Sequence, residues 1–236
     1  MSAVALLWFF AFRPLVDPLR AECETEEREQ AEQAQAQTSG VNAFIVLIAI
    51  LAAFAVANNF IKDGLTAWTP NILSQLYETP DWLSILLTLL LPVMAIGGSV
   101  VAVNVHKRTK NFVGSCAVLY IGSAILIGLV LGFISTPALP VTVACLALVS
   151  CLMAGVNNIV TSLVPLHLKS KINAGKLAGI LNGFCYLGST ISTYGLGAIA
   201  DGYGWLAVFI TLLAVCCAVI LVGVAYLLFT RKTANK

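Results

Sequence analysis

Long apolar runs are the feature that most constrains how this chain can fold. Residues 43–57 read AFIVLIAILAAFAVA, fifteen positions without a polar side chain. A helix of about 20 apolar residues crosses the hydrocarbon core of a bilayer, because each residue adds about 1.5 Å. Six runs of this kind follow one another along the chain. Their approximate ranges are 42–61 (continuing past its end), 83–105, 112–134, 139–164, 176–200 and 205–229.

The composition also indicates a membrane protein. Of the 236 residues, 59% are hydrophobic and 10% are charged, whereas a soluble domain carries roughly 25% charged residues. Backbone groups inside a bilayer must hydrogen-bond within their own segment, so the runs predict helices. We therefore expect an all-α membrane protein with a six-helix transmembrane domain over residues 41–236. A nucleic-acid partner is not expected, since the sequence has no basic stripe interleaved with aromatic residues.

Two segments precede the six runs. Residues 1–12, MSAVALLWFFAF, are apolar but short for a span, and they lack the basic start and cleavage site of a signal peptide. We interpret them as the remnant of a preceding transmembrane helix. Residues 13–40 contain six glutamates and no large apolar run after Leu19, which predicts an acidic, solvated linker. Six helices after such a linker suggest one half of a twelve-helix protein.

The basic residues are distributed unevenly among the segments between the runs. Twelve of the thirteen lie in the linker, 106–110, 167–176 and the tail after Phe229. The alternating segments 77–81, 135–140 and 201–204 hold no basic residue, and the first and third of them hold Glu78, Asp81 and Asp201. Cytoplasmic loops are enriched in Lys and Arg, so the linker and the C-terminus are expected on the cytoplasmic side of the cell (inner) membrane. The thirteenth basic residue is Lys62.

Lys62 and Asp63 interrupt the first apolar run. A lysine at the outer surface would be the single exception to the charge bias, and residues 64–77 are still largely apolar. We therefore expect Lys62 to face protein or water within the membrane, where it could bind an anion. The alternative is a lysine that reaches the outer headgroups from a helix ending near Ile61. Asp63 could pair locally with Lys62, but neighbours in a helix point about 100° apart. We therefore expect Asp63 to form a salt bridge with another helix, or to serve proton or substrate coupling.

Two pairs of asparagines recur in the first and fourth runs. The pairs are Asn58–Asn59 and Asn157–Asn158. These runs would begin two successive three-helix sets that cross the membrane in opposite directions, as in an inverted repeat. All four amides are candidates to line one substrate-binding cavity. Hydrogen bonds between helices without any substrate are the alternative.

The fifth run adds a tyrosine and a glycine stripe. Tyr186 lies four residues after Asn182 and shares its helix face, so it is a further candidate to face the cavity. Gly175, Gly179 and Gly183 are four apart, which predicts a smooth face for close helix packing. The sequence has no nucleophile–base constellation, phosphate-cradling loop or acidic metal cluster, so neither an enzyme nor a cofactor or metal is expected.

Two blocks carry a resemblance to a known family. They are FIKDGLTAWTPNIL at 60–73, and AGKLAGILNGFCYLG at 174–188 followed by ADGYGW at 200–205. Residues 41–236 resemble the C-terminal six helices of a major facilitator superfamily transporter, and more narrowly the organophosphate:phosphate antiporter family. The first block is similar to the basic-x-Gly-x-x-x-Trp-x-Pro block of that family's seventh helix. The second is similar to the block of its eleventh helix.

The resemblance implies a secondary transporter that moves a phosphate ester or inorganic phosphate by alternating access, with an N-terminal six-helix half as its partner. Lys62 stands where the family has a basic residue that helps to bind the substrate phosphate. The chain departs from the family in having lysine where arginine is frequent, and Asp63 where tyrosine is common. Two alternatives stay open: a truncated or split half that does not transport, and a facilitator-type transporter of a non-phosphate solute such as a drug or sugar.

Overall fold

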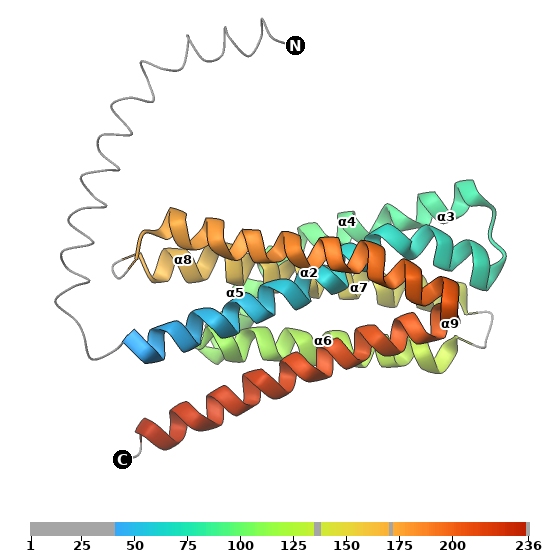
Figure 1. Ribbon diagram of the computed structural model, residues 1–236. Coiled ribbons are helices and arrows are strands. Elements are labelled where there is room, and N and C mark those ends of the chain that lie inside the picture. Colours follow the sequence, from blue (N-terminus) through green and yellow to red (C-terminus); the bar gives the residue numbers. More distant parts are fainter. Residues whose placement is uncertain (1–40, 135–137, 170–171, 235–236) are drawn as a thin grey trace, which may run out of the picture.

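The computed structural model describes residues 41–134, 138–169 and 172–234 (Figure 1). These residues are almost entirely helical and include no strand. Five of their helices are long and apolar enough to cross a membrane. The chain is therefore an all-α protein with the properties of a multi-pass membrane protein, as the apolar runs predict. The segments 1–12 and 13–40, interpreted above as a helix remnant and a linker, lie outside the described residues.

The first half of the bundle contains three long rods. Helix α2 spans Val41–Tyr77 and continues through Pro70. The second rod is α3 (Asp81–Thr88), α4 (Leu90–Ile96) and α5 (Gly98–Thr109), in which Leu89 and Gly97 keep right-handed helical angles between the pieces. The third rod is α6 (Phe112–Phe133). Helix α2 is thus longer than the first apolar run, 42–61, and extends past its end as expected.

The second half begins with a rod of mixed helix type. It consists of α7 (Leu139–Asn158), the π-helix η1 (Ile159–Leu163) and α8 (Val164–His167). Pro165 has no N–H to bond to the carbonyl of Thr161, which accounts for the widened turn before it. The apolar run alone predicts a regular helix here, although Pro165 inside it indicates a local break in the backbone hydrogen bonds.

Helix α9 spans Ala174–Ala234 and is folded back on itself at Gly204. Figure 1 shows its two arms, orange and red, joined by a sharp bend. Gly204 has φ 79° and ψ 174°, a backbone conformation that glycine adopts without a Cβ clash. The sequence predicts a loop over 201–204, but the helix persists through Tyr203 and only Gly204 leaves helical geometry. The fifth and sixth runs are thus two arms joined by a single residue.

The two ends of the bundle carry opposite charges. The start of α2, the α5–α6 turn, α8 and the start of α9 lie at one end in Figure 1, and residues 78–80 and the bend of α9 lie at the other. Charged residues of the first end are Lys107, Arg108, Lys110, Lys169 and Lys176, and those of the second are Glu78, Asp81 and Asp201. The alternation read from the sequence is therefore present in space. Placing the basic end in the cytoplasm stays a prediction.

A two-residue turn closes the basic end between α5 and α6. Lys110 has φ 52°, in the left-handed region, and Asn111 caps α6 by accepting hydrogen bonds from the backbone N–H groups of Val113 (3.0 Å) and Gly114 (3.3 Å). We expect Asn111→Ala to lower the free energy of unfolding by about 1 kcal/mol, because these N–H groups lose their acceptor. Equilibrium unfolding in mixed micelles measures this. Asn111→Asp keeps the acceptor and should retain stability; equal stability of all three proteins would contradict the role of the cap.

Candidate solute-binding site

Lys62 and Asp63 lie near the middle of α2, which runs from Val41 to Tyr77. The helix does not end near Ile61, so Lys62 does not stand at a helix end. The ammonium Nζ of Lys62 is 3.4 Å from Oδ1 of Asp63, and the two side chains are 26% and 34% exposed. An ion pair therefore stands about halfway along an apolar helix, partly open to the surroundings of the bundle.

Asp63 also connects α2 to α9. Its Oδ2 accepts hydrogen bonds from Ser189 Oγ and from Asn59 Nδ2, the second at 3.2 Å. Among the described residues its charged partner is the neighbouring Lys62 rather than a residue of another helix, so the local pairing is the one observed. The flexible four-carbon stem of lysine lets the ammonium turn toward the adjacent carboxylate. The contact with another helix is made by a hydroxyl instead.

The network continues from α2 into α7. Asn58 is fully buried, and its Nδ2 donates to Asn59 Oδ1 at 2.9 Å and to Asn157 Oδ1 at a long 3.5 Å. The thiol of Cys185 on α9 lies 3.6 Å from the same oxygen of Asn157. Among the described residues, Asn58 Oδ1 has no hydrogen-bond partner. Three helices thus meet at one polar cluster with an unmet acceptor inside it.

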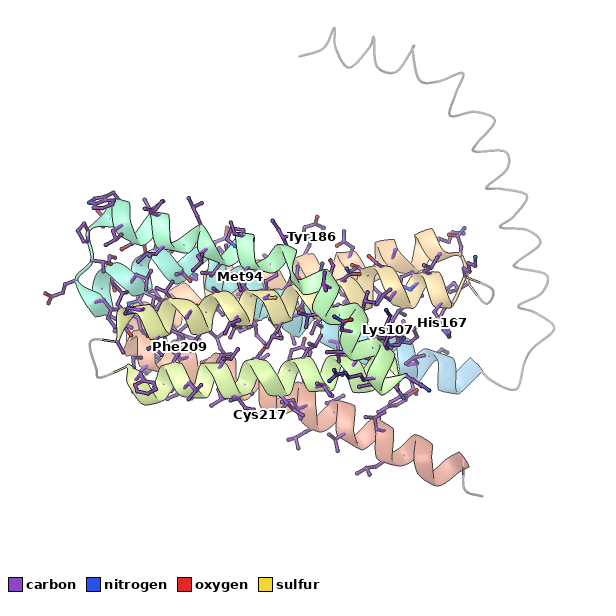
Figure 2. The ribbon with its side chains drawn as sticks, turned by 180° about the vertical axis from the view of Figure 1, so that it is seen from behind. Met94, Lys107, His167, Tyr186, Phe209 and Cys217 are labelled. Atoms are coloured by element: carbon purple, nitrogen blue, oxygen red, sulfur yellow. The ribbon has the colours of Figure 1, made fainter. Side chains whose placement is uncertain are left out.

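Two candidate residues do not join this cluster. Asn158 donates from Nδ2 to Ser99 Oγ on α5 at 2.7 Å, because its side chain projects about 100° away from that of Asn157. Asn158 is therefore separate from the cluster that the other three asparagines form, and its place in a solute cavity stays a prediction. Tyr186 is 65% exposed and lies at the outer edge of the bundle in Figure 2. It stands on the flank of α9 next to the cluster rather than inside it.

A glycine outside the predicted stripe, Gly188, brings the helices of the cluster close together. A Cβ at Gly188 would lie 2.1 Å from the carbonyl oxygen of Val56, so the backbones of α9 and α2 touch here. The predicted glycine stripe is not at a close helix contact, because a Cβ at Gly179 or Gly183 would meet no atom within 4 Å. Close packing thus uses Gly188, next to Ser189, rather than the stripe.

The two sequence blocks meet in space on the acidic side of the cluster. The indole rings of Trp68 and Trp205 have their centroids 6.1 Å apart. Trp68 Nε1 donates to the carbonyl of Thr193 at 3.2 Å, and Trp205 Nε1 donates to Gln75 Oε1 at 2.8 Å. Both indole N–H groups therefore link α2 to α9. Together with Gly188 they fix how the two helices face each other around Lys62 and Asp63.

Comparison with known proteins does not add a family to this geometry. No protein-family model and no curated protein matches the chain. Within residues 41–134, 138–169 and 172–234, no group of three or more His, Cys, Asp or Glu side chains is arranged to hold a metal ion.

Proposed function

We propose that the chain is the C-terminal six-helix half of a secondary transporter that moves a small anionic solute by alternating access. The Lys62–Asp63 pair, midway along the apolar helix α2, is the observation that carries this proposal. Ionisable side chains at such depth are costly in a membrane and mark the pathways of solutes or ions. Because both side chains are partly exposed, they need protein or water beside them rather than lipid.

The exposed polar flank of α9 beside the Lys62–Asp63 pair indicates a second helical bundle as the partner. Asn182, Tyr186 and Thr193 are exposed on α9, and their spacing with Ser189 places all four on one flank of the helix. Polar groups at this depth are tolerated where they meet protein or a water-filled cavity. An N-terminal six-helix half, as the family resemblance implies, would supply that cavity between the two bundles.

The arrangement of α2 and α7 supports the inverted repeat that belongs to this proposal. The two rods run in opposite directions between the ends of the bundle in Figure 1. Each contributes an asparagine, Asn58 or Asn157, to the same cluster. Solute sites of such transporters lie near the bilayer midplane, between repeats, and rocking of the halves opens them to either side. The cell inner membrane and a cytoplasmic basic end complete the proposal.

An organic phosphate, moved alone or in exchange for inorganic phosphate, is the proposed solute. The ammonium of Lys62 offers three N–H donors and a positive charge to phosphate oxygens. The resemblance of residues 60–73 to the antiporter block adds the expectation of phosphate. A facilitator of an uncharged solute such as a sugar is the second candidate, because Asp63 cancels the charge of Lys62 locally.

Lys62→Met is expected to lower uptake of radiolabelled glycerol phosphate at least about tenfold. The loss corresponds to one charge-assisted hydrogen bond, which contributes about 1.5–3 kcal/mol. Proteoliposomes containing the transporter expressed from its complete reading frame give the measurement. Lys107→Met, at the exposed basic end, is the matched control and should transport normally. Normal uptake by Lys62→Met would remove Lys62 from the site, and uptake of a sugar but of no phosphate would favour the second candidate.

A further inference from the structure

Asp63 restricts what Lys62 can bind, and the inference drawn from it rests on the proposed transport function. Oδ2 of the carboxylate is held by Ser189 from α9 and by Asn59 from α2. Oδ1 is the oxygen that faces Lys62 Nζ, at 3.4 Å. Since two helices hold Oδ2, the carboxylate stays beside the lysine when a solute arrives. Its Oδ1 is then shared between the lysine and the solute.

The charges at the centre of the bundle balance locally. Lys62 and Asp63 are the two charged residues of α2, and the rod 139–167 has none. The charged residues of the first arm of α9, Lys176 and Asp201, lie close to its two ends. A solute with only an anionic group must therefore break the Lys62–Asp63 pair. It must also approach a carboxylate of its own charge.

The amides around the pair include one buried acceptor that has no partner in the described part of the chain. Asn58 Nδ2 is engaged by Asn59 and Asn157, and Asn59 Nδ2 is engaged by Asp63. Asn58 Oδ1 is buried and has no partner among the described residues. Phosphate oxygens need donors, whereas an unmet acceptor and a carboxylate oxygen both suit a solute that brings N–H groups. This observation is independent of the ion pair, and it also favours a solute that carries N–H donors.

We infer that the site selects a zwitterionic solute, with an anionic group for Lys62 and a protonated primary amine for Asp63. Such a solute replaces one ion pair by two, so that neither protein charge is left unpaired. A solute without the amine leaves Asp63 facing its anionic group. Asp63 is thus a specificity-determining residue. Within residues 60–73, Lys62 matches the antiporter block and Asp63 departs from it.

Equilibrium binding of three small solutes tests this inference. The probes are 2-aminoethyl phosphate, ethyl phosphate, which lacks the amine, and β-alanine, which has a carboxylate in place of the phosphate. Titration calorimetry at pH 7 on the complete transporter in lipid nanodiscs gives each Kd. We expect 2-aminoethyl phosphate to bind at least about tenfold more tightly than ethyl phosphate, the ratio that one lost charge-assisted contact produces. In Asp63→Asn the preference should fall below about twofold, because ethyl phosphate no longer meets a carboxylate.

The outcomes separate this inference from the proposed function. Equal binding of the two phosphates, or an unchanged preference in Asp63→Asn, overturns the inference alone. Tight binding of β-alanine with weak binding of both phosphates upholds the amine requirement and overturns phosphate as the solute. Binding of none of the three overturns both proposals. If Asp63→Asn does not fold, N-acetyl-2-aminoethyl phosphate replaces the variant, since its amide is uncharged. It should bind the wild-type protein as weakly as ethyl phosphate, and tight binding would overturn the inference.

Discussion

Gly188→Val is expected to prevent the folded bundle from forming, and Gly188→Ala to destabilise it by about 3 kcal/mol. The atoms that a Cβ would meet belong to the backbone of α2: the carbonyl oxygen of Val56 at 2.1 Å, its carbon at 2.9 Å and the N of Phe60 at 3.1 Å. Backbone atoms within a helix cannot move aside as the end of a flexible side chain can. The helices must therefore separate, which also breaks the bond from Ser189 to Asp63.

Equilibrium unfolding of the purified chain in mixed micelles measures this effect, with Gly128→Ala as the matched control. A Cβ at Gly128, inside α6, would meet no atom within 4 Å. Its substitution should be neutral or stabilising, since alanine is favoured over glycine inside a helix by about 1 kcal/mol. If Gly188→Ala were as stable as Gly128→Ala, the close contact between α2 and α9 would be incorrect.

Helix positions could be predicted from the sequence because the constraint that produces them is local. An apolar run such as 112–134 satisfies its backbone only as a helix, and α6 matches it within a residue. For the bend at Gly204 the sequence predicts a four-residue loop, because Asp201 and glycines are typical of turns. One residue suffices there, since a single glycine with positive φ reverses the direction of the chain.

Packing between helices could not be predicted in the same way. The chain has 18 glycines, and sequence spacing selects Gly175, Gly179 and Gly183 as a stripe. Which face of α9 turns toward α2 depends on the rotation of the whole helix, which all of its contacts determine together. Gly188 lies at that contact, together with the small, buried residues Cys185 and Ser192 on the same helix face. From the sequence alone this face competes with the more regular glycine stripe.

Only part of the candidate site could be predicted, because charged residues stand out in an apolar run whereas contacts between helices do not. Lys62 and Asp63 are conspicuous because charged residues are rare in apolar runs. Ser189 is not conspicuous, since serine is common in membrane helices, and its bond to Asp63 joins residues 126 apart in the chain. Asn157 and Asn158 look equivalent in sequence, but one faces α2 and the other faces α5. Only the arrangement of the helices distinguishes them.

Neutralising Asp63 alone is expected to cost more stability than neutralising Lys62 and Asp63 together. Asp63→Asn leaves the Lys62 ammonium without its counter-ion halfway along α2, whereas Lys62→Met combined with Asp63→Asn leaves no charge there. A charge that loses its partner in a low-dielectric site keeps its desolvation cost. Since the two side chains are a quarter to a third exposed, solvent screens part of this, and we expect a coupling energy of about 1–2 kcal/mol.

A double-mutant cycle on free energies of unfolding in mixed micelles gives this coupling energy. Asparagine retains the shape of Asp63 and an oxygen to accept the bond from Ser189, so the cycle reports charge rather than packing. Lys107→Met combined with Asp63→Asn is the control pair, and its effects should add within about 0.5 kcal/mol because Lys107 lies at the basic end. Additive effects of Lys62→Met and Asp63→Asn would mean that water solvates the two charges separately. Asp63 would then not oppose the binding of an anion to Lys62. The selection of a zwitterionic solute by this pair would lose its physical basis.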